Sequence, residues 1–207
     1  MDMNLFYAVS GICWLIVDPM IPDDTSGMKK RFIQIVKDKG YERRQEAFKL
    51  SSGGLSHDYI DMRRALSDGA DLELAAKFLM RSLEERNITF DVIGGMTMGA
   101  DPISHAVAVV GAKSWFSVRK QEKAHGRQQR IEGALLNGEK KVILVEDTVS
   151  TGRSLLEAFD VLKEARVEVT ALCTLLDRGL SMAEKMDGEK TLYIPLITYQ
   201  DLEIDPL

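Results

Sequence analysis

The hydrophobic positions of this chain alternate between helical spacing and short apolar runs. Apolar residues at helical spacing predict helices over 25–40, 72–86, 102–110 and 152–164. Apolar runs predict strands over 90–93, 114–118, 141–145 and 167–176. Alternating helices and strands of this kind predict an α/β fold, with a parallel sheet covered by helices on both faces. Ligands of such sheets bind beyond the carboxyl ends of the strands, so we expect a functional site there.

The amino-terminal segment differs from the rest of the chain. Leu5–Val17 is an apolar run of thirteen residues, shorter than the roughly 20 that span a bilayer as a helix. No Lys or Arg precedes it, unlike the start of a secretory signal. We therefore expect this run to be a buried strand or an arm that covers a partner, and not a membrane-spanning helix or a secretory signal. The first predicted helix follows, with Thr25 or Ser26 as its cap and Gly40 at its end. We therefore divide the chain into an extension, 1–27, and one domain, 28–207.

Composition and charge narrow the class of protein. A chain of 207 residues with 45% hydrophobic and 29% charged positions can bury a globular core. The net charge of −5 provides no overall basic field for nucleic acid or an anionic membrane, so we expect neither as a partner. Cys13 and Cys173 are the two cysteines, far apart in sequence, which argues against a disulfide framework or a zinc site. A reducing, cytoplasmic location is expected.

The most informative segment is 142–154, an apolar strand that ends in Glu146 and Asp147 and continues into a helix. The turn between them holds Thr148, Val149, Ser150, Thr151 and Gly152. Backbone N–H groups at a helix start, together with hydroxyl groups, form a pocket for a phosphate monoester. The two carboxylates can accept hydrogen bonds from vicinal sugar hydroxyls. A simple helix cap, with acids near the positive end of the helix, is the alternative.

A second segment concentrates positive charge. Residues 119–130 contain five Lys or Arg and one Glu, a net charge of +4 within an acidic protein. Cations gathered in this way can stabilise the negative charge that develops on a leaving polyanion. A solvated basic loop is the alternative interpretation.

Both segments resemble motifs of a known family. The run Glu146-Asp147-Thr148-Val149-Ser150-Thr151-Gly152 is similar to the signature with which type I phosphoribosyltransferases bind phosphoribosyl pyrophosphate (PRPP), in the form found in orotate phosphoribosyltransferases. The pattern Arg-Lys-x-x-Lys-x-His-Gly at 119–126, followed by Ile-Glu-Gly at 131–133, resembles the mobile catalytic loop of the same family.

Three further segments extend the resemblance. Residues 48–63 look like the hairpin over the base, although Ser51 stands where some relatives have lysine. Residues 91–102 resemble the glycine-rich turn near pyrophosphate, without the lysine that the family often has near Gly99. Residues 176–179 partly resemble the stretch whose arginine binds the carboxylate of orotate, here Arg178. An ion pair between Arg178 and Asp177 is the alternative.

The resemblance covers roughly residues 28–179 and implies a fold, an activity and a set of roles. The implied fold is that of the type I phosphoribosyltransferases, a mainly parallel central sheet flanked by helices with a small hood over the base site. The implied activity transfers phosphoribose from PRPP to orotate, giving orotidine 5′-monophosphate and pyrophosphate. The implied cofactor is Mg²⁺ bound through PRPP, without protein ligands of its own, and the implied assembly is a homodimer that shares the catalytic loop between subunits.

Each predicted site residue then has an expected role. Those expected at the reacting centre are Arg119, Lys120, Lys123, His125 and Asp147. Those expected to bind PRPP are the same four basic-loop residues with Glu146, Asp147, Thr148, Val149, Ser150, Thr151 and Gly152. Thr151 and Arg178 are expected to bind orotate.

Two other functions are weighed against this one. The same fold could act on another base, such as uracil or a purine, which the departures at Ser51 and Gly99 leave open. A PRPP-sensing regulator without catalysis would keep the phosphate turn, yet it would have no need of Lys123 and His125. Consumption of orotate distinguishes these alternatives.

Overall fold

The computed structural model describes residues 24–49, 54–121, 130–136, 138, 140–179, 181–186 and 191–204. The helices are α1 (Thr25–Ile35), the π-helical turn η1 (Val36–Gly40), α2 (Met62–Ala65), α3 (Gly69–Glu84), α4 (Asp101–Val110), α5 (Arg153–Glu164) and α6 (Ser181–Lys185). The strands are β1 (Tyr41–Lys49), β2 (Leu55–Ile60), β3 (Val92–Met96), β4 (Ser114–Val118), β5 (Ile131–Gly133), β6 (Val142–Val149), β7 (Val169–Asp177) and β8 (Leu192–Thr198).

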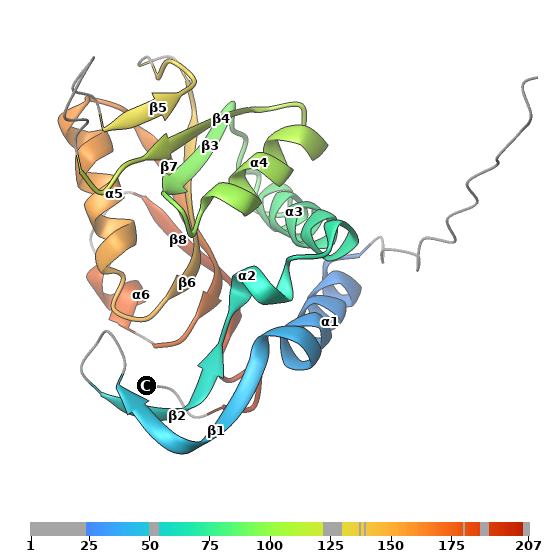
Figure 1. Cartoon of the computed structure of the whole chain (residues 1–207). Coiled ribbons are helices and arrows are strands. Elements are labelled where there is room, and N and C mark those ends of the chain that lie inside the picture. The colour runs from blue at the N-terminus through green and yellow to red at the C-terminus, as the bar shows by residue number, and fades with distance from the viewer. Residues whose placement is uncertain are drawn as a thin grey trace, which may run out of the picture.

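A six-stranded sheet forms the centre of the molecule, in the order β5-β4-β3-β6-β7-β8 (Figure 1). All neighbouring pairs are parallel except β4 and β5, which are antiparallel. The parallel pairs align the carboxyl ends of β3, β4, β6 and β7 along one edge of the sheet. The α/β fold with a mainly parallel sheet is therefore confirmed.

Helices cover both faces of this sheet, which explains why its central strands are apolar throughout. Successive side chains of a strand point to opposite faces. Ile93 and Ile143 accordingly belong to the core beneath α1, α3 and α4, whereas Val92 and Leu144 belong to the core beneath α5 and α6. Figure 1 shows these two groups of helices on opposite sides of the strands. Burial on both faces fixes the strand register and hence the positions of the loops.

The hairpin β1–β2 lies outside the central sheet as a separate antiparallel pair. Asp61 ends it by capping α2, because its side chain accepts hydrogen bonds from the backbone N–H groups of Arg63 and Arg64. Figure 1 shows the hairpin beyond one end of the strands. Asp58 of β2 lies within electrostatic range of Tyr199, which follows β8. The hairpin therefore lies at the carboxyl edge of the sheet. This is the position expected for the hood.

Several predicted details are wrong, each for a local reason. The cap of α1 is Asp24, whose carboxylate accepts the N–H of Gly27 at 2.7 Å, and not Thr25 or Ser26. Gly94 and Gly95 lie inside β3, where close packing against β4 and β6 leaves no room for a side chain. Strands β5 and β8 were not predicted, since β5 is short and β8 contains a proline, which an edge strand tolerates.

The predicted end of the first helix at Gly40 is confirmed, although its last turn is π-helical. α1 crosses the predicted division between 27 and 28, and residues 1–23 lie outside the described part of the chain. The division into an extension and a domain stays a prediction. Within the described residues, no helix has the length and apolar character needed to cross a membrane.

Candidate active site

Two adjacent carboxylates lie near the carboxyl end of β6, which continues through Thr148 and Val149 and is therefore longer than predicted. Glu146 is buried and Asp147 half-buried, and Glu146 Oε1 accepts the backbone N–H of Asp147 at 3.2 Å. Burial, followed by the negative charge of Asp147, raises the pKa of Glu146 from its usual value to about 9. The pair therefore disfavours two full negative charges and favours a proton, a cation or hydroxyl donors beside it.

The turn after these acids opens α5 with its first N–H groups pointing to the sheet edge. Gly152 is the residue before the helix and adopts φ 75°, a left-handed conformation that glycine accepts without strain. No side chain of the described residues caps this helix, so its N–H groups can bind a phosphate instead. Val149 is buried, and only its backbone can face a ligand.

The turn between β3 and α4 packs directly on the acid pair. A methyl group built on Gly99 would lie 2.6 Å from Glu146 Oε1 and 2.8 Å from Asp147 Oδ1. No side chain fits at that position, so the backbone of the turn and the two carboxylates share one small space. Asp101 fixes the turn further, because it accepts hydrogen bonds from Thr97 at 2.6 Å and from Ser117 of β4 at 2.7 Å.

The basic segment begins where β4 ends. Arg119 forms an ion pair with Glu132 at 3.2 Å, and the positive charge of Lys120 acts on Glu146. Lys120 therefore lies within electrostatic range of the acid pair, as the predicted site requires. Lys123 and His125 lie outside the described residues, and their roles stay predictions.

Arg130, for which the sequence indicated no role, holds together the two ends of the basic segment 119–130. Its Nε donates to the backbone oxygen of Arg119 at 3.0 Å, and its Nη2 contacts Glu157 of α5 at 2.5 Å. The backbone N–H of Arg119 also donates to the oxygen of Arg130 at 2.7 Å. Arg130 thus joins the two ends of the loop to each other and to α5.

Arg178 follows β7 and approaches the phosphate turn from the other side. Its backbone N–H donates to the oxygen of Val149 at 2.7 Å, and its Nε donates to the hydroxyl of Tyr199 at 2.6 Å. Asp177 instead accepts the hydroxyl of Tyr193 at 2.8 Å and the N–H of Gly179 at 3.0 Å. Asp177 is thus engaged elsewhere, which disfavours the simple ion pair considered as an alternative for Arg178.

The two arginines assigned to substrates share one property. Among the residues that the structure describes, the buried side-chain nitrogens without a hydrogen-bond partner are Nε of Arg119 and Nη2 of Arg178. A buried N–H group without a partner costs free energy, which a ligand oxygen can recover. Arg119 and Arg178 therefore each have a buried N–H group that a substrate oxygen could bind.

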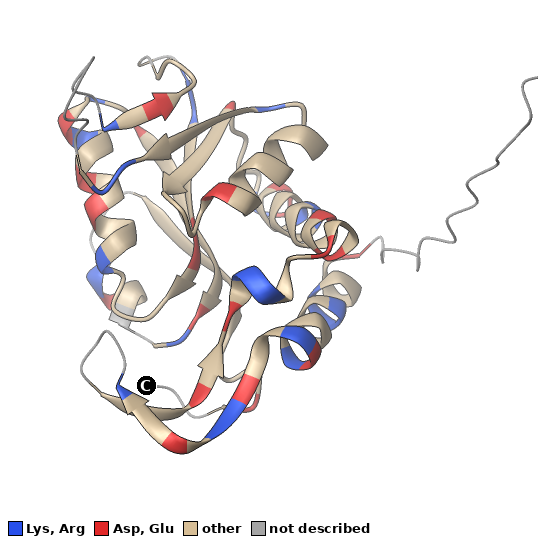
Figure 2. Cartoon of the chain, in the orientation of Figure 1, with Lys and Arg blue, Asp and Glu red and all other residues tan. Residues whose placement is uncertain are grey.

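A cavity of about 230 Å³ adjoins the acid pair. It is lined by Asp147 and Gly99 together with Met62 and Arg63 of α2, the end of the predicted hairpin segment. In Figure 2, α2 is the blue segment between the hairpin and the sheet. Segments that are far apart in sequence, 48–63, 91–102 and 142–154, therefore meet at one place.

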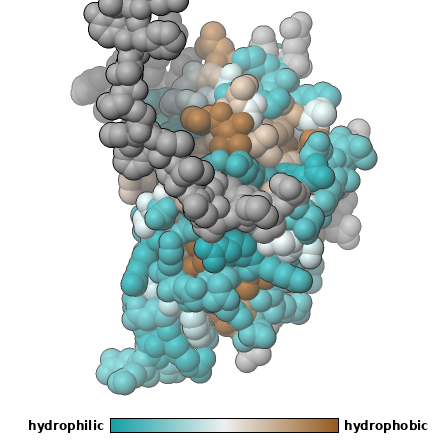
Figure 3. Space-filling view, turned by 90° about the vertical axis from the view of Figure 1, so that its right-hand side faces the viewer, coloured by the Kyte–Doolittle hydropathy of each residue, from teal (hydrophilic) through white to brown (hydrophobic). Residues whose placement is uncertain are grey.

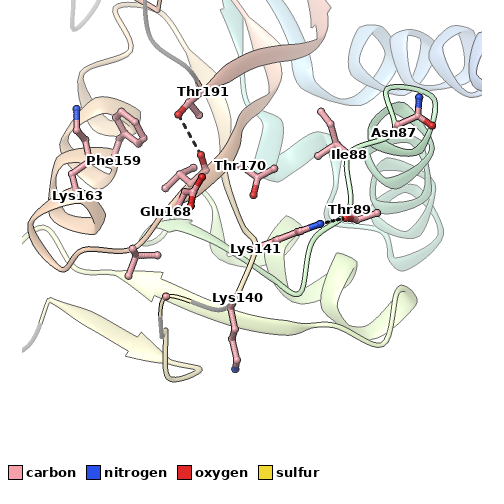
Figure 4. Close-up of a pocket in the computed structure, with 13 residues that line it drawn as sticks. Asn87, Ile88, Thr89, Lys140, Lys141, Phe159, Lys163, Glu168, Thr170 and Thr191 are labelled. Carbon is pink, nitrogen blue, oxygen red and sulfur yellow. Dashed lines mark hydrogen bonds between the residues drawn. The ribbon is translucent and has the colours of Figure 1, made fainter.

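A larger cavity of about 870 Å³ lies at the opposite edge of the sheet, where the strands begin. Three lysines line it, but they do not converge (Figure 4). Lys140 points away from the cavity, Lys141 donates to Thr89 at 2.9 Å, and Lys163 lies over the ring of Phe159. None of the predicted motifs reaches this edge, so the functional site is the one at the carboxyl edge.

Known proteins are similar to this chain in sequence and fold. A family model, the phosphoribosyl transferase domain, matches residues 63–195. The orotate phosphoribosyltransferase of Streptomyces coelicolor is 37% identical over 184 residues, which cover 86% of this chain and 98% of that protein. That of Pyrococcus furiosus is 36% identical over 155 residues, 75% of this chain and 85% of that protein.

A solved structure agrees with both matches. The crystal structure of Mycobacterium tuberculosis orotate phosphoribosyltransferase in complex with PRPP superposes with a TM-score of 0.70 and 30% identity, covering 86% of this chain and 99% of that one. The chain therefore belongs to the phosphoribosyltransferase family and, within it, to the orotate phosphoribosyltransferases.

Proposed function

We propose that the site at the carboxyl edge of the sheet transfers the phosphoribosyl group of PRPP to orotate, giving orotidine 5′-monophosphate and pyrophosphate. The observation that carries this proposal is the convergence of the phosphate turn, the acid pair, Lys120 and Arg178 at that edge. The relatives named above are orotate phosphoribosyltransferases and include one crystallised with PRPP.

The phosphate turn and the acid pair would hold the sugar. The free N–H groups at the start of α5, with the hydroxyls of Thr148, Ser150 and Thr151, bind the 5′-phosphate. Glu146 and Asp147 accept hydrogen bonds from the two ribose hydroxyls. Gly99 leaves room for the pyrophosphate to approach backbone N–H groups, because no side chain stands between them.

The reaction is a displacement at the anomeric carbon. The lone pair of orotate N1 forms the new bond to this carbon while the bond to pyrophosphate breaks, and the bonding electrons leave with pyrophosphate. Arg119 and Lys120, with Lys123 and His125 as predicted partners, neutralise the charge that develops on the leaving group. Asp147, beside the ribose, stabilises the positive charge that develops on the sugar.

The acid pair also fits Mg²⁺. Two carboxylates share one small space, and their mutual repulsion would be relieved by a cation that prefers oxygen ligands. Among the described residues, no group of three or more His, Cys, Asp or Glu side chains could hold a metal ion. We propose that Mg²⁺ arrives with PRPP, bound mainly by its oxygens. When bound, it would withdraw charge from pyrophosphate.

Arg178 would select the base. A guanidinium group offers paired donors at the spacing of the two carboxylate oxygens, and orotate carries a carboxylate that uracil lacks. Thr151 stays a predicted second contact to orotate. A base without a carboxylate would leave Arg178 without this partner, and PRPP sensing without catalysis would not need a cation to stabilise a leaving group.

A homodimer is part of the proposal, and an exposed apolar surface on α4, β4 and the segment after β5 supports it. Val109, Trp115 and Leu135 are 83%, 41% and 84% exposed, although they are large and apolar. Figure 3 shows apolar surface gathered in the upper part of one side of the molecule, where α4 lies in Figure 1. Val109 and Trp115 lie near the end of α4 and the beginning of β4, whereas the basic loop follows the end of β4. A cytoplasmic location stays a prediction.

The experiment that tests the function follows the ultraviolet absorbance of orotate with purified protein, PRPP and Mg²⁺. We expect orotate to be consumed, and Lys120→Ala to lower kcat on the order of a hundredfold, because it removes a cation beside the leaving group. Lys140→Ala, at the opposite edge of the sheet, is the matched control and should retain activity.

Parallel reactions with uracil and hypoxanthine test the alternatives. Consumption of either base in preference to orotate would overturn the assignment of the substrate. Binding of PRPP without consumption of any base would favour the sensing function instead.

A further inference from the structure

Arg178 is held in place by its backbone before any ligand binds. Its N–H group donates to the oxygen of Val149 in the phosphate turn at 2.7 Å. The residue before it, Asp177, ends β7 and its oxygen accepts the N–H of Tyr199 at 3.1 Å. The start of the arginine side chain is therefore fixed relative to both the phosphate turn and the segment after β8.

The far end of the side chain is held by Tyr199. The guanidinium carbon lies 5.4 Å from the centre of the Tyr199 ring, and Nε donates a hydrogen bond to the hydroxyl at 2.6 Å. Tyr199 is itself rigid, because it is 1% exposed and packs in the core beneath α1, α3 and α4. Its backbone oxygen accepts the N–H groups of Leu202 and Ile204. A buried phenol with a fixed backbone is a precise support for a guanidinium group.

This contact determines which donors of Arg178 remain for a ligand. A guanidinium group can bind a carboxylate through its side, with Nε and one terminal nitrogen, or through its end, with both terminal nitrogens. Tyr199 occupies Nε, and Nη2 is buried without a hydrogen-bond partner among the described residues. The end of the group is therefore the part left for a substrate.

We propose that Tyr199 is the positioning residue that directs the two terminal nitrogens of Arg178 at the carboxylate of orotate. This inference rests on the proposed function and extends it, since it assigns the orientation of the base to a residue that does not touch the reacting atoms. Without the hydroxyl, Nε loses its partner and the guanidinium can rotate, so fewer molecules present both terminal nitrogens together.

The test is Tyr199→Phe, which keeps the ring in the core and removes the hydroxyl. We expect the KM for orotate to rise about tenfold, the size typical of a hydrogen bond to a charged group, while kcat and the KM for PRPP change less than about twofold. Tyr193→Phe is the matched control. Tyr193 lies in β8, and its hydroxyl donates to Asp177 and, among the described residues, not to Arg178. The KM of this variant for orotate should therefore stay unchanged.

A double variant separates positioning from a general structural effect. In an Arg178→Lys background there is no guanidinium to orient, so adding Tyr199→Phe should not raise the KM for orotate further. A second rise of similar size would overturn the inference, and so would an equal rise in the KM for PRPP in the single variant. Thermal unfolding of each variant shows that the comparison is made between folded proteins.

The two levels of the proposal fail differently. Wild-type protein that binds PRPP without consuming orotate contradicts the proposed function. Wild-type protein that consumes orotate, with an unchanged KM in Tyr199→Phe, contradicts the role of Tyr199 alone.

Discussion

Single residues of the site are tuned by burial and by their neighbours. Glu146 is the clearest case, because the residue is 6% exposed and its carboxyl group lies beside Asp147. Its pKa in the folded protein is about 9, against an ordinary value of 4.5. The folded state therefore holds a proton that the unfolded chain releases, and stability decreases as the pH rises between these two values. Each pH unit in this range costs on the order of 1 kcal/mol.

Replacing Glu146 with Gln should remove this pH dependence. The amide does not ionise, so we expect Glu146→Gln to raise the melting temperature relative to wild type, more at pH 8.5 than at pH 5. PRPP binding should weaken in the same variant, since the amide nitrogen cannot accept from a ribose hydroxyl. Calorimetry at the two pH values measures the first effect and isothermal titration the second. A melting-temperature difference that is equal at both pH values would contradict the raised pKa.

At the scale of elements, the site depends on how closely two turns approach each other. The turn from β3 to α4 packs on the end of β6 with no space for a side chain at Gly99. Gly99→Ala should displace either this turn or the acid pair, at a cost of about 1–3 kcal/mol, as for overpacking elsewhere. We expect kcat/KM for PRPP to fall about tenfold or more, measured by orotate consumption.

Gly69→Ala is the control for this prediction. Gly69 opens α3, and a methyl group built there meets no atom within 4 Å. Its activity should equal that of wild type. Similar losses in both variants would show that the close packing at Gly99 has no special effect on the site.

At the scale of the whole molecule, one surface should decide both assembly and activity. Val109, near the end of α4, is 83% exposed and belongs to the apolar surface proposed as the dimer interface. Val109→Glu should place a charge in the proposed dimer interface, shift the protein to monomer in analytical ultracentrifugation, and lower orotate turnover. Leu192→Glu is the control. Leu192 is 56% exposed on the opposite edge strand, so this variant should leave assembly and turnover intact.

The local sequence predicted the elements that carry their own signal. β4 was predicted with its observed bounds, and α4 and α5 to within one residue of their starts, because apolar spacing and turn residues are local features. β1 was predicted only at its end, since most of its residues are exposed and the apolar alternation that marks a half-buried strand is missing. β8 was missed because its place is decided by pairing with β7.

The same division holds for the site. The order of charged and hydroxylated residues at the end of β6 and after β6 and β4 identified the acid pair, the phosphate turn and the basic segment, because each is a contiguous run whose chemistry is visible in the sequence. Tyr199, Asp101 and Arg130 were not found, because their importance lies in partners 21, 16 and 27 residues away. No local pattern marks a residue whose role is to hold another one.

The sequence by itself thus determined the class of fold, the family and the residues expected to contact substrate, because periodicity and contiguous motifs are written along the chain. The tertiary structure decided how those residues act together. It brought Gly99 against the acid pair, raised the pKa of Glu146 by burial, and set Tyr199 behind Arg178. These features depend on distances between segments that only packing of the sheet and its helices can fix.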